Sequence, residues 1–202
     1  MVQVSGQGVS PGPVFGLCSR PCLGEHENGD RGAVFRRDGV LLAIVADGLG
    51  HGPKAARAAG LAVDLVEATH ERDPRVIMGL VNEALKGSVG AAASIVVVDC
   101  RTGTISHCGV GNVATRLTGV GIVENRLIGI GGVLGSLRRV PRLEQACLLP
   151  GGMLVMTTDG VSLAFEAATI AGIPPADAAR LLVERYGRPH DDATALVMRI
   201  AP

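Results

Sequence analysis

Short runs of apolar residues, separated by turns rich in glycine, make up most of this chain. Runs of this length that are bounded by glycine, proline or aspartate are typical of β-strands. The pattern predicts strands at residues 14–19, 33–37, 40–46, 91–99, 104–110, 113–118, 142–148, 153–157 and 193–200. Asp38-Gly39 predicts a tight hairpin between the second and third of these, because both central residues of a type I′ turn need positive φ. The three strands between residues 91 and 118 are expected to form an antiparallel meander.

Apolar residues at three- to four-residue spacing predict helices in two parts of the chain. One helix begins at Pro53, since proline suits the first helical position, and is expected to end near Arg72. A second helix begins after Asp73-Pro74 and stops at Gly87. Helical patterns return at residues 162–168 and 175–186, and residues 125–141 are expected to form a surface loop with a short strand.

The order of these elements indicates the fold class. Strands come first, then two consecutive helices, several strands, further helices and a last strand, without regular alternation of strand and helix. This order is typical of the α+β class, in which helices cover the faces of antiparallel sheets. A chain of 202 residues and 20.6 kDa fits one domain, so a single domain over residues 1–202 is expected.

Charge and composition exclude several classes of partner. Lys plus Arg and Asp plus Glu both total 19, so no net charge attracts nucleic acid or an anionic membrane. Aromatic residues are 2% of the chain, which leaves no platform for stacking bases. The longest apolar run, residues 40–46, is far shorter than the ~20 residues of a membrane helix. With no leader-like pattern at the start, we expect a cytoplasmic protein without nucleic-acid or membrane partners.

The five cysteines are odd in number and irregularly spaced, which predicts reduced thiols rather than disulfides. Cys18 and Cys22 form a C-x3-C pair with no second pair to complete a zinc site. None of the five is followed by arginine six residues later, so the loop of a cysteine-dependent phosphatase is absent.

Acidic residues stand where predicted strands end. Asp47 and Asp159 follow apolar runs, Asp191 precedes one, and Asp30 lies in the loop before the hairpin. Carboxylates gathered at one end of a sheet repel each other unless a cation neutralises them. Oxygen ligands alone favour magnesium or manganese over zinc. Aspartate is also an ordinary turn residue, so each position has that simpler interpretation.

Five segments together resemble the ordered motifs of the metal-dependent serine/threonine phosphatases, the PPM family. They are Asn28-Gly29-Asp30, residues 46–52 (ADGLGHG), Gly109-Val110-Gly111-Asn112, Thr158-Asp159-Gly160 and Asp191-Asp192-Ala193-Thr194. The small size and the DGLG form of the second motif are similar to the SpoIIE-type branch and its stress-response members. The resemblance covers the chain from about Asp30 onward.

The resemblance implies a compact αββα sandwich of two antiparallel sheets flanked by helices, without a large flap subdomain. It also implies two divalent cations, manganese or magnesium, at one end of the sandwich. Asp47 would bridge the cations and the carbonyl of Gly48 would bind one of them, while Asp30, Asp159 and Asp191 would complete the other shell. In the last motif the chain has Asp191-Asp192 where the family usually has Asp-Asn, so Asp191 would be the ligand. In the first motif it has Gly29-Asp30, as SpoIIE-type relatives do, where many other members have Glu-Asp.

The chemistry of a phosphoester fits these residues. Without a cysteine nucleophile, the attacking group would be a water activated by the two cations. His51 is the candidate proton donor to the leaving oxygen, and His190 is its rival. Each histidine has a second interpretation as a solvated loop residue. Candidates for a phosphate-binding arginine are Arg31, Arg138 and Arg139, which the sequence does not rank.

The resemblance implies a protein serine/threonine phosphatase whose substrate is a phosphorylated STAS-domain protein of a stressosome-like complex. The alternative is a phosphatase fold kept as a binding or regulatory module with weak turnover. The intact set of acidic residues favours the enzyme.

Overall fold

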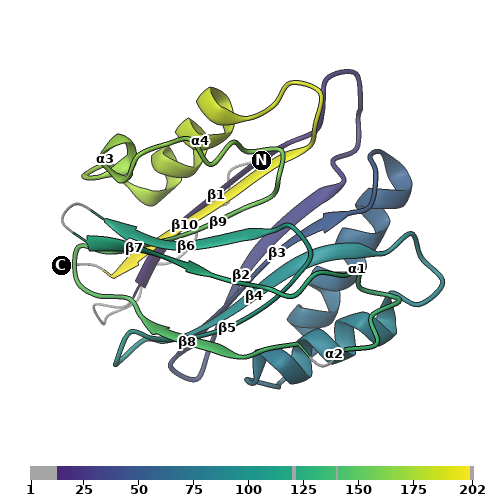
Figure 1. The fold of residues 1–202 in the computed structure, drawn as a ribbon, viewed down its shortest axis with the longest axis horizontal. Coiled ribbons are helices and arrows are strands. Elements are labelled where there is room, and N and C mark those ends of the chain that lie inside the picture. Colours follow the sequence, from purple (N-terminus) through teal and green to yellow (C-terminus); the bar gives the residue numbers. More distant parts are fainter. Residues whose placement is uncertain (1–12, 120–121, 140, 201–202) are drawn as a thin grey trace.

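The computed structural model describes residues 13–119, 122–139 and 141–200. Within them, two five-stranded antiparallel sheets pack face to face with helices on both outer faces (Figure 1). The α+β class and the αββα sandwich are confirmed.

The first sheet has the strand order β1-β10-β9-β6-β7 and the second β2-β3-β4-β5-β8. The strands of the first sheet are β1 (Pro13–Arg20), β10 (Ala193–Ile200), β9 (Met153–Thr157), β6 (Ala114–Gly119) and β7 (Ile122–Leu127). Those of the second are β2 (Asp30–Arg37), β3 (Val40–Gly48), β4 (Ala91–Asp99), β5 (Thr104–Val110) and β8 (Glu144–Cys147). Helices α1 (Pro53–Ala68) and α2 (Pro74–Ala84) cover the second sheet, and α3 (Ala167–Ile170) and α4 (Pro175–Tyr186) cover the first.

The continuous apolar run of β3 follows from its place in the sandwich. Leu42, Ile44 and Ala46 pack toward α1 and α2. Leu41, Ala43 and Val45, on the opposite face, pack against the first sheet. A strand covered on both faces has no solvent side, so it shows no polar alternation.

The predicted hairpin is confirmed. Asp38 has φ 41° and Gly39 has φ 82°, the positive values that a type I′ turn needs. The resulting register pairs Asp30 directly with Asp47 across β2 and β3. The turn at one end of the hairpin thus brings two candidate carboxylates together at the other end.

Polar groups also cross between the sheets. The hydroxyls of Ser94 on β4 and Thr115 on β6 share a hydrogen bond of 2.7 Å, and Ser94 lies 3.0 Å from Nε2 of His107. Burial lowers the pKa of His107 to about 4, which keeps the ring neutral near pH 7. These three residues form one polar link between the two sheets.

The expected meander is wrong in its third strand. β4 and β5 pair as expected, but β6 pairs with β7 and β9 in the other sheet. The chain crosses between the sheets at Gly111, whose φ is 87°. Alternation of apolar residues marks a strand but does not decide which of two packed sheets receives it.

The helix expected to reach Arg72 ends at Ala68. Thr69 is extended, and the guanidinium of Arg37 donates hydrogen bonds to the carbonyls of Val66, Glu67 and Thr69. This distant side chain satisfies the free carbonyls at the end of α1, so the helix stops one turn early.

The helix expected at residues 162–168 is also wrong, since α3 spans only Ala167–Ile170. The amide of Ser162 donates to the carbonyl of Tyr186 at 2.8 Å, and the ring of Phe165 packs edge-on against that of Tyr186. Pairing with the end of α4 therefore replaces local helical hydrogen bonds in this segment.

The segment 125–141 contains more order than a surface loop. Residues 125–127 belong to β7, and Leu134 is fully buried and pairs with Ala91. Asn82 on α2 accepts hydrogen bonds from the amides of Gly135 and Leu137 at 2.9 and 3.0 Å. Residue 140 lies outside the described residues.

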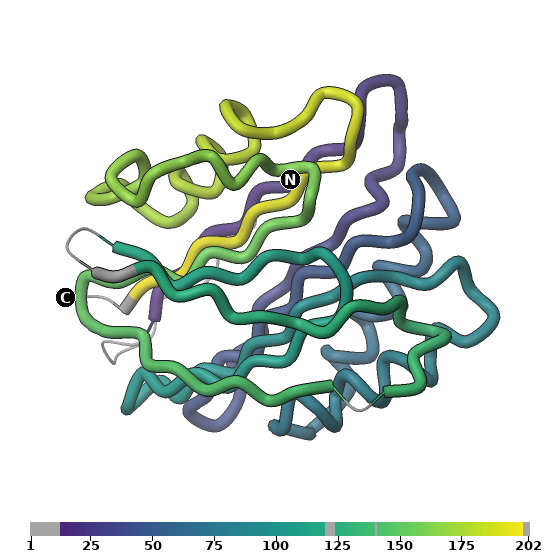
Figure 2. Tube along the Cα trace, viewed as in Figure 1, coloured from purple at the N-terminus to yellow at the C-terminus, as the bar shows by residue number. Residues whose placement is uncertain are grey.

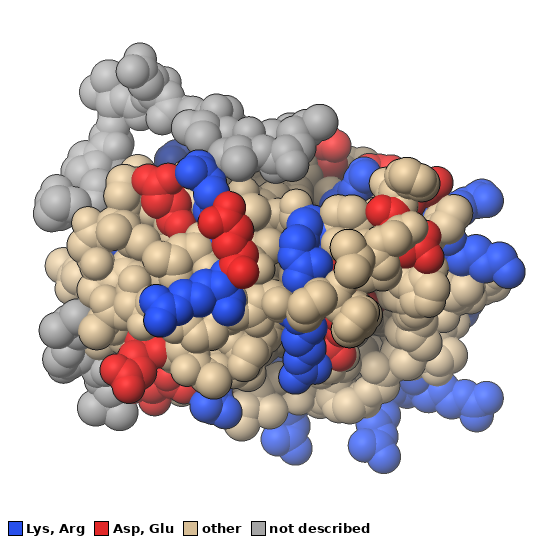
Figure 3. Space-filling model, turned by 90° about the horizontal axis from the view of Figure 1, so that it is seen from above, with Lys and Arg blue, Asp and Glu red and all other residues tan. Residues whose placement is uncertain are grey.

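The surface agrees with the balanced charge count. On the face shown in Figure 3, acidic and basic side chains are interspersed. No helix among the described residues has the length and hydropathy needed to span a bilayer.

Two glycines test how closely the helices approach the sheets. A Cβ on Gly16 of β1 would lie 2.2 Å from backbone atoms of Ala176 on α4, so Gly16→Ala should destabilise the fold by about 2 kcal/mol or more. Gly79 on α2 has no neighbour within 4 Å of such a Cβ, so Gly79→Ala should stabilise it by about 0.5–1 kcal/mol. Urea unfolding of both variants measures the difference, and equal effects would contradict this packing.

Candidate active site

Three of the predicted carboxylates line one cleft of about 270 Å³. Asp47 lies near the end of β3, Asp159 follows β9, and Asp191 precedes β10. The cleft is also lined by His51, His190 and Asn112. Both sheets therefore contribute acidic residues to the same end of the sandwich.

The loop after Asp47 is shaped by its glycines. A Cβ on Gly48 would lie 2.1 Å from the carbonyl oxygen of Ala55, so any side chain would collide with the first turn of α1. Gly50 and Gly52 have φ values of 86° and 72°, which favour glycine. The chain can thus turn from β3 into α1 within a few residues and carry His51 to the rim of the cleft.

His51 is exposed but has a defined partner. Its Nδ1 lies 2.8 Å from Oε1 of Glu25, which comes from the loop between β1 and β2. With Nδ1 engaged, Nε2 is the ring nitrogen left for the cleft. His190 lines the same cleft, and the structure gives its ring no hydrogen bond or ion pair with the described residues.

Asp30 lies behind the cleft rather than on its wall. Its Oδ2 accepts a hydrogen bond of 2.6 Å from the hydroxyl of Thr158, and the residue is buried. The hydroxyl of Thr158 also accepts from the amide of Thr194 at 3.0 Å. The structure therefore brings Asp30 beside Asp47 but aims one of its oxygens at the opposite sheet.

Further hydroxyls and an amide extend this contact into a network. Thr194 and Ser19 share a hydrogen bond of 2.5 Å, and the side-chain amide of Asn28 donates to Ser19 at 2.6 Å. The side-chain oxygen of Asn28 accepts from the backbone amide of Asp30 at 2.9 Å. The network joins the first strands of both sheets at the end that carries the cleft.

Asp192 has a structural role that its sequence position did not reveal. Its two carboxylate oxygens accept hydrogen bonds from the amides of Cys22 at 2.9 Å and Gly29 at 3.0 Å. A Cβ on Gly29 would lie 2.7 Å from Oδ2 of Asp192. The carboxylate of Asp192 therefore accepts hydrogen bonds from both amides and leaves no room for a side chain at position 29.

The loop of residues 21–29 holds the segment before β10, and the two run side by side (Figure 2). The amide of Leu23 donates to the carbonyl of Pro189 at 2.9 Å. Arg20 donates to the carbonyls of Arg188 and Asp191 at 2.7 and 3.2 Å. The sequence did not predict this role, because Arg20 and residues 21–27 belong to none of the five motifs.

Asn112, like Asp192 and Arg20, has a contact in the site that the sequence did not predict. Its side-chain amide donates to Oδ2 of Asp159 at 2.6 Å, which fixes that carboxylate on the cleft wall. The signal was present, since Asn112 ends the Gly-Val-Gly-Asn segment. The three arginine candidates, Arg31, Arg138 and Arg139, are exposed, and none is among the residues that line the cleft.

The carboxylates are electrostatically strained. Burial, followed by repulsion from Asp30, Asp159 and Asp191, raises the pKa of Asp47 to about 8. Burial also raises the pKa of Asp30 to about 7, although the hydrogen bond from Thr158 opposes this shift. The pKa of Asp191 is raised by burial and by the charge of Asp159. Positive charge in the cleft would relieve the cost of ionising these groups.

The donor set fits a hydrated hard cation better than a closed metal cage. Among the described residues, no three His, Cys, Asp or Glu side chains converge as a ready-made metal site. Instead, Asp47, Asp159 and Asp191 border an open cleft with room for water. Magnesium usually keeps several waters and binds through one or two carboxylates, so this arrangement suits it.

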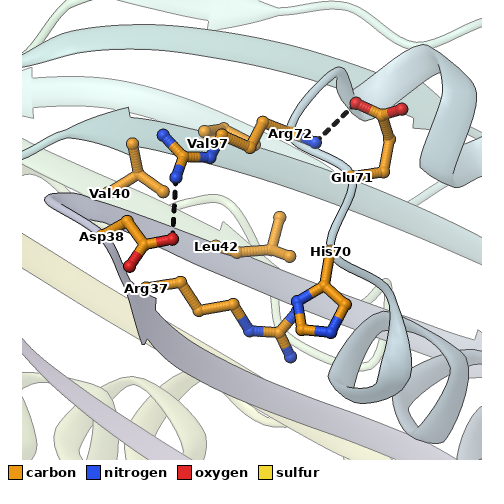
Figure 4. A pocket seen from close by; sticks show the side chains of 8 residues that line it. All are labelled: Arg37, Asp38, Val40, Leu42, His70, Glu71, Arg72 and Val97. Atoms are coloured by element: carbon orange, nitrogen blue, oxygen red, sulfur yellow. Dashed lines mark hydrogen bonds and ion pairs between the residues drawn. The ribbon is translucent and has the colours of Figure 1, made fainter.

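A smaller pocket of about 50 Å³ lies at the other end of β3 (Figure 4). Asp38 and Arg72 form an ion pair of 2.9 Å at its edge, while Val40, Leu42 and Val97 are apolar parts of its lining. Its charged groups are satisfied by each other and by the end of α1, so it lacks the unpaired acids of the main cleft.

Two packed antiparallel sheets with carboxylates gathered at one end define a domain of the PP2C fold, as the PPM resemblance implied. Solved PP2C domains share it, including the SiaA domain of Pseudomonas aeruginosa (23% identity, 92% of this chain and 85% of that chain, TM-score 0.75). The family model described as Stage II sporulation protein E (SpoIIE) matches residues 37–201. The chain belongs to the SpoIIE family.

Three comparisons refine this likeness. The phosphoserine phosphatase RsbX of Bacillus subtilis (strain 168) is 30% identical over 126 residues, which are 62% of this chain and 63% of that relative. A structure from work on the bacterial stressosome is 30% identical, with a TM-score of 0.87 over 93% of this chain and 99% of that one. RsbX in complex with magnesium is 24% identical, with a TM-score of 0.87 over 99% of this chain and all of that one.

Neutralising Asp47 should stabilise the protein when divalent cations are removed. The pKa of Asp47 is about 8 in the folded protein and near 4 in the unfolded chain. Below pH 4 the carboxyl is protonated in both states and costs no stability, and its cost grows as pH rises from 4 to 8. In EDTA at pH 8, Asp47→Asn should raise the free energy of unfolding by ~1–3 kcal/mol, and at pH 4 by much less. Thermal unfolding measures both values.

The exposed Asp64 on α1 provides the control for this test. Asp64→Asn should leave the pH dependence of the wild type unchanged. A gain from Asp47→Asn that is equal at pH 4 and pH 8 would contradict the electrostatic origin of the effect.

Proposed function

We propose that this protein is a protein serine/threonine phosphatase of the RsbX type. The observation that carries the proposal is the convergence of Asp47, Asp159 and Asp191, from both sheets, on one open cleft with His51 at its rim. Membership in the SpoIIE family and the likeness to a phosphoserine phosphatase support the same reaction.

The proposed cation ligands are Asp47, the carbonyl of Gly48, Asp159 and Asp191, with Asp30 as the carboxylate behind Asp47. Two divalent cations, magnesium or manganese, would supply a lowered pKa for the attacking water and positive charge for the phosphoryl oxygens. Several residues of the chain keep these ligands in place. Asn112 fixes Asp159, and Arg20 holds the backbone on both sides of His190.

His51 is the proposed proton donor. The serine or threonine oxygen is a poor leaving group, and its departure is faster when it receives a proton as its bond to phosphorus breaks. His51 lines the cleft, and because its Nδ1 is held by Glu25, Nε2 is the nitrogen left to donate a proton. His190 remains the rival donor, but no contact with another described residue orients its ring in a comparable way.

The proposed substrate is a phosphorylated STAS-domain protein of a stressosome-like complex. The support is the 30% identity to a chain described in work on the bacterial stressosome. Balanced surface charge suits a protein partner recognised by shape and local contacts.

Incubation of the protein with a phosphorylated STAS-domain protein should remove the phosphate from that substrate. Mass spectrometry of the substrate measures the loss. Loss of phosphate from unrelated phosphoproteins at the same rate would contradict this specificity.

Asp47→Asn should greatly reduce phosphatase activity. With manganese or magnesium present, the wild-type protein should hydrolyse p-nitrophenyl phosphate and a phosphoserine peptide, and both activities should disappear in EDTA. Loss of a carboxylate that lines the cleft should lower kcat/KM by about 100-fold or more, because the cleft would bind the divalent cations less well. Release of p-nitrophenolate and of inorganic phosphate measures the two reactions.

Asp64→Asn, which changes the same kind of charge on the outer face of α1, should keep wild-type activity. Wild-type protein that releases no phosphate from either substrate with either cation would contradict the enzyme. In that case the fold would be a binding or regulatory module.

A further inference from the structure

We propose that Glu25 is a positioning residue that holds His51 as the proton donor to an alcohol leaving group. This inference rests on the proposed phosphatase function. It assigns a role to Glu25 in the loop of residues 21–29, a position outside the five family motifs.

The contact itself is well defined. Oε1 of Glu25 lies 2.8 Å from Nδ1 of His51, although the two residues are 26 positions apart. The side chain of Glu25 is 31% exposed and that of His51 is 67% exposed. An exposed ring without a partner would sample several rotamers, so its direction depends on this one hydrogen bond.

The surroundings of Glu25 are built to receive its carboxylate. Gly52 has φ 72°, and a Cβ there would lie 3.3 Å from Oε2 of Glu25. Gly52 is also the residue before α1, and the first turn of this 16-residue helix contains no acidic residue. Negative charge near a helix N-terminus is favourable, so Glu25 supplies from another loop what α1 lacks.

The same loop is anchored at several other points. Its amides at Cys22 and Gly29 donate to the buried carboxylate of Asp192, and that at Leu23 donates to Pro189. These hydrogen bonds fix the backbone on both sides of Glu25. His51 is therefore oriented by a carboxylate on a restrained loop rather than by a mobile surface side chain.

The chemistry explains why orientation of this ring matters. The water oxygen forms a bond to phosphorus, the bond between phosphorus and the serine oxygen breaks, and the Nε2 proton goes to that serine oxygen. The proton released by the water returns to the ring through solvent. The ring must start with a hydrogen on both nitrogens: Nδ1–H keeps its hydrogen bond to Glu25, Nε2–H gives its proton to the serine oxygen, and the ring is left neutral.

Two substrates with different leaving groups test this role. A phosphoserine peptide releases an alkoxide that needs a proton, whereas p-nitrophenyl phosphate releases a phenolate that is stable without one. Glu25→Ala should lower kcat on the peptide by about tenfold and kcat on p-nitrophenyl phosphate by less than about twofold, since general acid catalysis is worth ~10²–10⁴-fold. Glu25→Gln, which retains the size of the side chain, should show the same selectivity with a smaller loss.

A double-mutant cycle connects the effect to His51. His51→Ala should lower peptide turnover more than Glu25→Ala does. In the His51→Ala background, removal of Glu25 should cost nothing further on the peptide. Glu27→Ala is the matched control, because Glu27 is exposed on the same loop and carries the same charge.

The outcomes separate this inference from the proposed function. Equal losses on both substrates would make Glu25 a purely structural residue, and unchanged peptide turnover would leave it without a role. Either result overturns the inference while the phosphatase function stands. Wild-type protein that is inactive on both substrates overturns the function and the inference together.

Discussion

A buried hydrogen bond from Thr158 to Asp30 joins the two sheets at the end that carries the cleft. Thr194 and Ser19 extend this contact to β10 and β1, and Asn28 returns it to the backbone of Asp30. The positions of the cleft carboxylates depend on this link, because Asp47 belongs to one sheet and Asp159 and Asp191 border strands of the other. If the sheets separated here, the acidic residues would no longer share a site.

The same arrangement places like charges close together in partly buried positions. Burial, followed by repulsion between the carboxylates, raises the pKa values of Asp30 and Asp47 to about 7 and 8. Ionised carboxylates at these positions cost stability, which a bound cation would offset. The balanced total charge of the chain conceals this local excess, since the compensating arginines are not on the cleft wall. Without bound cations, gathering these carboxylates at one end of the sandwich is therefore unfavourable for stability.

The loop of residues 21–29 contacts three parts of the site that no strand pairing joins. It binds Asp192 through backbone amides, the segment before β10 through Leu23, and His51 through Glu25. Asp192, which directly precedes β10, occupies the space beside Gly29 and leaves no room for a side chain there.

Local patterns in the sequence determined the hairpin at Asp38-Gly39, most strand positions, the starts of α1 and α2 and the acidic residues at strand ends, because each depends on neighbouring residues alone. The convergence of Asp47, Asp159 and Asp191 remained an expectation until the register and sheet order were known. Only the tertiary structure decided that β6 belongs to the other sheet and that α1 ends at Ala68, where Arg37 binds its last carbonyls. It also decided that the segment around Phe165 contacts the end of α4 instead of forming a helix. It also decided that Asp30 turns toward Thr158 and that Glu25 meets His51. These contacts join residues distant in sequence, and neither spacing nor hydropathy encodes which distant partner a side chain will reach.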